Sequence, residues 1–208
     1  MYKGDLRANM DVHIINFREL KLVNPAVEDV VLAVSKGNGW ERGLSPFFVG
    51  PCSLYDGHVS KNVENGWQFT KIYKEHLDGD EISQRYWDWA KSGWSDTFAH
   101  RYPMGKGAIP EFSLWKGERL GYIDARKKIY IPLYRKAVIE TYAFKMLKQK
   151  YEAYKKMDKD LFLVDYDAYM HKKLDMSYEG VVNRKDKKMG HAFVLGMLLE
   201  CPEYVYSF

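Results

Sequence analysis

The stretch that decides the fold class runs from residue 132 to residue 166 and reads PLYRKAVIETYAFKMLKQKYEAYKKMDKDLFLVDY. Its first part, 132–157, carries apolar residues spaced four apart, Val138 and Tyr142 among them, with lysines between the rows. That spacing predicts an amphipathic helix. Its last part, 161–166, is a short apolar run ending in acidic and aromatic residues, which predicts a buried strand. The chain therefore mixes α and β structure.

The N-terminal part adds further strand signals. Two short β-branched runs, 12–17 and 27–34, predict two strands separated by turn residues. Asn24 followed by Pro25 also fits a helix start, with the asparagine as cap and the proline at the first helical position. Both interpretations of this turn stay open at this point.

The remaining segments are helices joined by long loops. Apolar residues on one broad face predict a helix over 63–77, a second helix is expected over 81–91, and 192–199 is apolar on all sides, as a buried helix would be. The segments 43–62 and 93–121 are rich in glycine and proline and predict structured loops. Loops of such length in a compact domain usually carry function.

We expect a single domain over residues 1–208, because no repeat, low-complexity tract or linker divides the sequence. An N-terminal strand-rich segment, 1–42, precedes a body over 43–208. Helices and strands follow one another without a regular βαβ rhythm, which favours the α+β class with a helix-rich body and a small sheet.

Composition limits the classes of protein that remain. The chain has 208 residues, 46% of them hydrophobic, enough for one closed core. It contains no apolar run of membrane-spanning length, and the first five residues lack the pattern of a secretory signal, so we expect a cytoplasmic protein. Cys52 and Cys201 lie far apart and are expected to be buried, reduced thiols.

Charge and aromatic content permit, but do not require, a nucleotide-like ligand. The balance of 32 basic and 28 acidic residues gives a net charge of +4, which allows an anionic ligand without making nucleic acid the default partner. The 16 tyrosines, 10 phenylalanines and 6 tryptophans suit a pocket that stacks on bases or sugars. The alternative is that these rings only fill the core.

One face of the predicted 63–77 helix gathers polar side chains. Glu64, Gln68, Lys71 and Glu75 fall within a narrow sector of the helical wheel, so their side chains share a surface. The alternative is a solvated face in which Lys71 and Glu75 form an i, i+4 ion pair.

Four short motifs occur in an order that resembles a known family. Gly43-Leu44-Ser45-Pro46-Phe47-Phe48 resembles a Leu-Ser-Asn-Phe-Tyr motif, and Glu64 with Gln68 and Lys71 resembles a Ser-Glu-His-x-x-Gln-x-x-Lys helix. Asp167-Ala168-Tyr169 resembles an acidic turn, and Lys188-Met189-Gly190 resembles an Asn-x-Leu-Gly helix start. Together they resemble the YbiA-like N-glycosidases, the family also named NADAR for its proposed link to NAD and ADP-ribose.

The sequence departs from that family at three places. Pro46 replaces the asparagine of the first motif, Asn62-Val63 replaces the serine-containing dipeptide before Glu64, and Met170-His171 replaces the Trp-Gly that follows the acidic turn. The last change removes a stacking tryptophan. The resemblance implies an α+β fold and a hydrolase that cleaves an N-glycosidic bond of a phosphorylated ribosyl compound or an ADP-ribosyl adduct.

The residues fit this chemistry. Cleavage of an N-glycosidic bond passes through an oxocarbenium-like state, which needs a carboxylate to stabilise the cation or activate water and a donor for the departing base. Glu64 and Asp167 are the expected catalytic pair, and Lys71 is expected to bind phosphate or ribose hydroxyls. The expected substrate-binding residues are Ser45, Phe47, Trp67, Gln68, Lys71, Lys106, Arg126 and Tyr169. Desolvation and mutual repulsion should raise the pKa of at least one of the two carboxyl groups, and we expect this to be Glu64 unless Lys71 pairs with it.

Other chemistries lack their signatures. The six histidines show no HxxxH or HExxH spacing, Gly-x-Ser-x-Gly is absent, and Gly105-Lys106-Gly107 lacks the rest of a phosphate loop. We therefore expect no metal and no cofactor. The basic residues around the central loop could clamp phosphate, or they could be solvated, as basic residues in loops usually are; they are Arg101, Lys106, Arg119, Arg126, Lys127 and Lys128.

Two alternatives belong to other functional classes. A non-catalytic module would bind nucleic acid or protein through the tyrosines and lysines of 134–157. A pseudoenzyme would sense ADP-ribose or NAD without cutting it, which Met170 in place of tryptophan allows. The expected partner is a nucleotide-like small molecule or an ADP-ribosylated nucleobase; nucleic acid stays open, and no membrane is expected.

Overall fold

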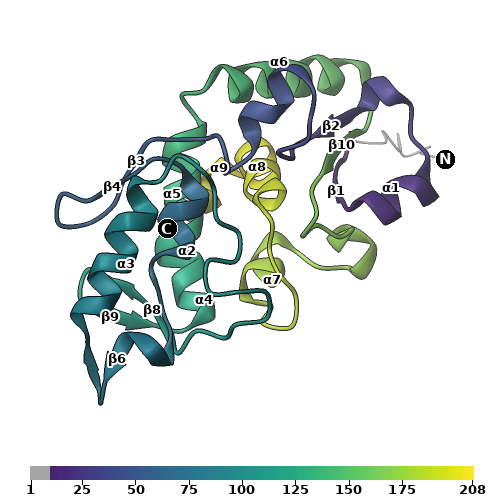
Figure 1. Ribbon diagram of the computed structural model, residues 1–208. Helices are drawn as coiled ribbons and strands as arrows, with labels where there is room; N and C mark the ends of the chain where they lie inside the picture. Colours follow the sequence, from purple (N-terminus) through teal and green to yellow (C-terminus); the bar gives the residue numbers. More distant parts are fainter. Residues whose placement is uncertain (1–9) are drawn as a thin grey trace.

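The computed structural model of the protein describes residues 10–208 (Figure 1). The N-terminal sequence that argues against a secretory signal lies outside the described residues, as does the start of the 1–42 segment. Helices and short strands are interspersed along the described chain, and the strands form small separate sheets. The structure confirms the α+β class.

The first sheet joins the N-terminal strands to a strand that lies much later in the chain. Strand β10 (Leu161–Val164) lies between β1 (Val12–Ile15) and β2 (Val30–Leu32), and both neighbours run parallel to it. All four residues of β10 are buried. The three predicted strands are confirmed, each with a shorter span than expected. This sheet places the residues that follow β10 next to the C-terminal helices.

A short helix, α1 (Phe17–Val23), follows β1 and was missed by the sequence analysis. Asn16 caps it, because its side chain accepts hydrogen bonds from the first turn while Glu19 bonds back to the cap backbone. Asn24 ends this helix in the left-handed conformation, with φ of 49°. The alternative in which Asn24 starts a helix is therefore wrong; a 3₁₀ turn, η1 (Val27–Asp29), leads into β2 instead.

The predicted helix over 63–77 is wrong beyond its first six residues. Helix α2 (Val63–Gln68) ends early, and the chain continues into β5 (Lys71–Ile72), which pairs antiparallel with β8 (Phe112–Trp115). Of the apolar residues that suggested a longer helix, Phe69 is buried in the aromatic cluster around α3 (Gln84–Ser95) and Leu77 packs against that cluster. Phe69, Tyr73 and Leu77 are spaced four apart, yet none of them lies in an α-helix.

The predicted helix over 132–157 is two helices, α5 (Ile131–Val138) and α6 (Tyr142–Met157). Thr141 separates them, because its backbone is extended and its side chain caps α6 by accepting from the Phe144 N–H at 3.1 Å. Figure 1 shows α6 running along the top of the molecule while α5 descends through its centre. The break lets α5 form part of the central core.

Helix α8 (His191–Glu200) lies at the centre of the main core and confirms the predicted buried helix. It packs against β1 and α5 (Figure 1). The other elements are η2 (Gly39–Leu44), β3 (Cys52–Ser53), β4 (Val59–Ser60), η3 (Lys74–His76), β6 (Leu77–Asp78), β7 (Glu81–Ile82), β9 (Glu118–Leu120), α4 (Tyr122–Ala125), the π-helical turn η4 (Arg126–Tyr130), η5 (His171–Leu174), α7 (Tyr178–Asn183) and α9 (Pro202–Tyr206).

Two expectations about the chain as a whole concern thiols and membranes. Cys52 and Cys201 are both free; Cys52 is buried as expected, and Cys201 is partly exposed. Within residues 10–208, no helix has the length and apolar character needed to cross a bilayer.

Candidate functional site

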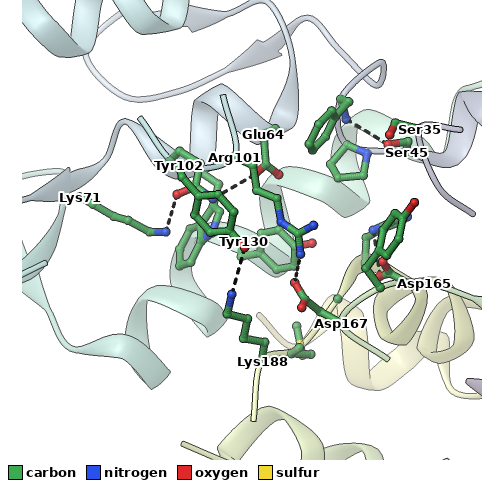
Figure 2. Close-up of a pocket in the computed structure, with 18 of the residues that line it drawn as sticks. Ser35, Ser45, Glu64, Lys71, Arg101, Tyr102, Tyr130, Asp165, Asp167 and Lys188 are labelled. Carbon is green, nitrogen blue, oxygen red and sulfur yellow. Dashed lines mark hydrogen bonds and ion pairs between the residues drawn. The ribbon is translucent and has the colours of Figure 1, made fainter. Parts of the chain in front are cut away.

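A cavity of about 520 Å³ lies where α2, the loop between α3 and β8, the segment after β10 and the start of α8 meet (Figure 2). Eight of the ten site residues expected from the sequence line it, although they come from distant parts of the chain. These eight are Ser45, Phe47, Glu64, Trp67, Gln68, Lys71, Arg126 and Asp167. The structure thus brings the expected carboxylate pair and its polar neighbours to one cavity.

The other two expected residues do not line this cavity. Lys106 is exposed, while its neighbours Gly105 and Gly107 contribute to the lining. Tyr169 packs on the ring of Phe193 at a centroid distance of 4.9 Å and does not contribute to the lining. The interpretation of both as substrate-binding residues is not supported by their positions.

The turn around Ser45 and Phe47 forms one wall and is attached to the start of α2. The Glu64 N–H donates to the carbonyl of Pro46 at 3.0 Å, so the proline that replaces an asparagine still accepts through its backbone. The Phe47 N–H lies 3.4 Å from the Ser45 hydroxyl oxygen. These contacts fix the turn against the helix that carries Glu64.

Glu64, Gln68 and Lys71 form a continuous hydrogen-bonded chain. The Gln68 side-chain amide donates to Glu64 Oε1 at 2.9 Å, and Lys71 Nζ donates to Gln68 Oε1 at 2.6 Å. Lys71 reaches Gln68 from the strand β5, after the helix has ended, and not along the helical face that the sequence predicted. Glu75, the fourth member of the predicted polar face, is exposed and does not line the cavity.

Burial shifts the pKa values of Glu64 and Lys71, the two end groups of this hydrogen-bonded series. It raises the pKa of the Glu64 carboxyl above its usual value, although the Gln68 hydrogen bond and the Lys71 charge oppose the change. It lowers the pKa of Lys71 to about 8, with the Glu64 charge opposing and the nearby Lys188 charge reinforcing the shift. The expected raised pKa of Glu64 is confirmed, and its cause is desolvation; repulsion from Asp167 is not among the causes.

Asp167, the second expected carboxylate, is paired with Arg101. The Arg101 Nη2 donates to Asp167 Oδ2 at 2.8 Å, and both side chains are about one-third exposed. The Arg101 guanidinium lies 5.4 Å from the Tyr102 ring centroid and 5.8 Å from that of Tyr166. From the sequence, Arg101 was expected to be solvated or to clamp phosphate, since nothing in the loop itself signals a partner 66 positions away.

A second ion pair, between Asp165 and His191, forms the inner wall and was also missed. His191 Nδ1 lies 3.1 Å from Asp165 Oδ2, and the Ala192 N–H at the start of α8 donates to the same oxygen at 3.3 Å. Gly190 is essential to this arrangement, because a Cβ atom there would come within 2.0 Å of Asp165 Oδ2. The acidic end of the predicted strand and the Gly-His start of the buried helix were the available signals.

The Arg126 side chain lines the cavity, but its guanidinium donates mainly to backbone carbonyls. Its Nη1 donates to the carbonyls of Val181, Val182 and Arg184, and its Nη2 donates to that of Lys187, all at 2.9 to 3.0 Å. These carbonyls belong to the last turn of α7 and to the segment that follows it. Because most of its donors are used in this way, the interpretation of Arg126 as a phosphate clamp is replaced by a structural role.

The lining as a whole combines aromatic rings with an excess of positive charge. Five lysine and arginine side chains line the cavity against three carboxylates. The aromatic lining residues are Phe47, Trp67, Tyr73, Tyr102, Tyr122, Tyr130 and Tyr166. Among residues 10–208, no three His, Cys, Asp or Glu side chains are gathered as a metal site requires. The arrangement suits a planar, polar ligand that carries negative charge.

Residues 18–177 match the model of a family of unknown function, DUF6939, and this match covers well over half of the chain. The chain belongs to the DUF6939 family. The matched part of this DUF6939 chain contains Glu64, Arg101 and Asp167, whereas Lys188 and His191 lie beyond it. No curated protein and no solved structure shows a significant match to this DUF6939 chain.

Proposed function

We propose that the protein hydrolyses the N-glycosidic bond of a phosphorylated ribosyl compound or an ADP-ribosyl adduct, including an adduct on a nucleobase. The observation that carries this proposal is that Glu64 and Asp167 line one cavity in unlike surroundings. Glu64 is buried with a raised pKa, whereas Asp167 is partly exposed and paired with an arginine. The motif resemblance to the YbiA-like N-glycosidases supports the same reaction class.

The two carboxyl groups divide the chemistry between them. Glu64, whose pKa is raised by burial, retains its proton more readily and donates it to the departing base. Asp167 acts as a carboxylate that stabilises the oxocarbenium-like state or activates water. In glycoside-cleaving sites, two carboxyl groups take these two roles because their surroundings differ.

Gln68 and Lys71 support Glu64. The Gln68 amide donates to Oε1 of Glu64, which leaves Oε2 as the oxygen that carries the proton. Lys71 holds Gln68 in that orientation and lies 4.8 Å from the centroid of the Trp67 ring. Trp67 and Tyr130, with ring centroids 5.3 Å apart, offer surfaces on which a base or sugar stacks.

The nucleic-acid module receives little support from the predicted 134–157 helix. Tyr134 is fully buried, and its hydroxyl donates to the carbonyl of Leu44 at 2.6 Å. Tyr154 is also buried, and its hydroxyl donates to the carbonyl of Glu28 at 2.6 Å. Two of the four tyrosines that were to contact nucleic acid are therefore part of the core.

Met170, which stands where the resembled family has a tryptophan, lies away from the cavity. Met170 packs against the small apolar cluster around Phe162 and Val164 and does not line the cavity. The aromatic surfaces of the cavity come from other residues. We also propose a cytoplasmic setting, in keeping with two free thiols.

The test is release of a free base from a panel of N-ribosyl compounds, including NAD, phosphoribosyl glycosides and ADP-ribosylated nucleobases, followed by chromatography. We expect turnover of at least one member by the wild-type protein and its loss in Glu64→Gln. Ligands of the panel that stabilise the protein against heat but are never cleaved would favour the sensing pseudoenzyme and contradict the proposal.

A further inference from the structure

The positive charges of the cavity are not equally available to a ligand. Lys71 donates to Gln68, and Arg126 donates to four carbonyls. Arg101 makes one ion pair, with Asp167, and Lys188 has no carboxylate within ion-pair distance among residues 10–208. Arg101, Lys188 and the exposed Lys36 therefore keep the most donors for a ligand, and of these Arg101 and Lys188 lie against one aromatic ring.

Arg101 and Lys188 meet at the same aromatic ring. The Arg101 guanidinium lies 5.4 Å from the Tyr102 ring centroid, and Lys188 Nζ lies 5.3 Å from it and 3.4 Å from the Tyr102 hydroxyl. Figure 2 shows the two side chains extending into the cavity from different segments of the chain. Two positive charges therefore lie around one ring at the cavity, and one of them has no carboxylate partner among the described residues, which favours an anion there.

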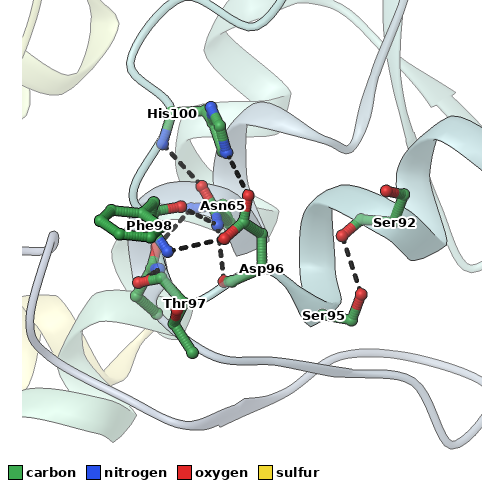
Figure 3. Close-up of polar contacts among 8 residues, drawn as sticks. Asn65, Ser92, Ser95, Asp96, Thr97, Phe98 and His100 are labelled. Atoms are coloured by element: carbon green, nitrogen blue, oxygen red, sulfur yellow. Dashed lines mark hydrogen bonds and ion pairs between the residues drawn. The ribbon is translucent and has the colours of Figure 1, made fainter.

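The loop that carries Arg101 is held by Asn65 (Figure 3). The buried Asn65 amide donates to the carbonyls of Asp96 and Phe98, at 3.1 and 2.8 Å, and its Oδ1 accepts from the His100 N–H at 2.8 Å. Asn65 thus uses both donors and its acceptor on the loop, and it lies next to Glu64 on α2. The helix that supplies the proposed acid also fixes the backbone just before Arg101.

The same loop is closed by its own side chains. Asp96 Oδ1 accepts from the Phe98 N–H at 2.9 Å, and Asp96 Oδ2 lies 2.7 Å from His100 Nε2. The backbone from 96 to 100 is therefore fixed before any ligand arrives. A guanidinium presented on a fixed loop loses less freedom on binding than one on a mobile loop.

We infer that Arg101 and Lys188 form a subsite for a phosphate or diphosphate group, and that Asn65 positions Arg101 within it. The guanidinium offers paired donors that match phosphate oxygens, and the lysine adds a second charge. This inference rests on the proposed function only in assigning the anion to a ribosyl ligand. It assigns the phosphate contact to Arg101 and Lys188 in place of Lys71, the residue expected from the sequence.

The binding test uses inorganic pyrophosphate and orthophosphate as probes, measured by calorimetry at fixed ionic strength. We expect Arg101→Gln and Lys188→Gln each to weaken pyrophosphate binding at least about tenfold. The matched surface variants Arg85→Gln and Lys145→Gln, both exposed, are expected to bind as the wild type does. No pyrophosphate binding by the wild type, or equal loss in the surface variants, would overturn the subsite.

Two further variants separate this inference from the proposed function. Glu64→Gln is expected to abolish hydrolysis without weakening pyrophosphate binding, and Lys71→Met is expected to leave pyrophosphate binding within a few-fold of the wild type. Loss of pyrophosphate binding in Lys71→Met but not in Arg101→Gln would place the anion at Lys71 and overturn the inference. If the wild type binds pyrophosphate but hydrolyses no substrate, the proposed function is contradicted and the subsite is retained.

The role of Asn65 is tested with a double-mutant cycle. If Asn65 acts through Arg101, Asn65→Ala weakens pyrophosphate binding in the wild type and adds little in the Arg101→Gln background. Additive losses would show a general structural effect and contradict the positioning role. Should Asn65→Ala fail to fold, Asn65→Asp replaces it, because it keeps the acceptor for the His100 N–H and loses both donors.

Discussion

His191 and Asp165 form a buried ion pair in which Nδ1 of the histidine lies 3.1 Å from Oδ2 of the aspartate. The other ring nitrogen, Nε2, faces the carbonyl of Ala33. Both nitrogens thus face oxygen atoms, an arrangement that the doubly protonated imidazolium satisfies beside an ionised Asp165. Burial alone would lower the pKa of His191, but Asp165 and the Ala33 carbonyl outweigh it and raise that pKa.

Removal of either partner is expected to destabilise the protein by about 3–5 kcal/mol, because it leaves a buried charge without its counterion. Urea denaturation of His191→Gln and Asp165→Asn near pH 6 measures this loss. The double variant should cost less than the sum of the two single losses, since the second change removes the uncompensated charge. Losses below about 1 kcal/mol would show that the pair carries no charge in the folded protein.

The contribution of His191 to stability should depend on pH. Because its folded-state pKa is raised, the contribution is fully present below the ordinary value of 6.5 and is lost as pH rises through the raised value. The pKa of Asp165 is lowered, since His191 outweighs burial, so its contribution is lost as pH falls below 3.8. The difference in unfolding free energy between wild type and His191→Gln should shrink toward alkaline pH. A difference that is constant from pH 6 to pH 10 would contradict this.

Glu64→Gln is expected to lower kcat by about 10²- to 10⁴-fold with little change in ligand affinity, because a proton donor acts mainly in the transition state. Base release from a cleaved substrate, together with its dissociation constant, measures both quantities. Glu75→Gln is the matched control, since Glu75 is exposed and outside the cavity. Full activity in Glu64→Gln would rule out Glu64 as the acid.

The Lys71 amine is expected to titrate with a pKa of about 8, against 10.5 for an ordinary lysine. Heteronuclear NMR of the side-chain ammonium groups measures this value directly. In Glu64→Gln the pKa of Lys71 should fall further, because the carboxylate charge that raises it is gone. An unshifted pKa in the wild type would show that water reaches the amine freely.

Gly190→Ala is expected to cost about 1–3 kcal/mol, because its Cβ would clash with Asp165, whose carboxylate is fixed by His191 and the helix start. Thermal or urea unfolding measures the cost. Gly121→Ala is the matched control, since a Cβ there meets nothing within 4 Å. Equal stability of the two variants would show that Asp165 has room to move.

Much of the secondary structure could be predicted from local pattern. The buried run 161–166 and the apolar segment 192–199 lie where β10 and α8 are found, because burial on every side leaves an unmistakable local signal. The boundaries within 63–77 and 132–157 could not be predicted. Burial of aromatic residues against α3 and capping by Thr141 override the periodicity there.

For the candidate site, the sequence by itself determined the residue types and one local spacing, that of Glu64 and Gln68, because residues four apart on a helix lie side by side. Only the tertiary structure decided their partners. Arg101 meets Asp167 across 66 positions, and His191 meets Asp165 across the packing of α8 on the first sheet. Ion pairing and desolvation depend on distance in space, which the order of residues along the chain does not encode.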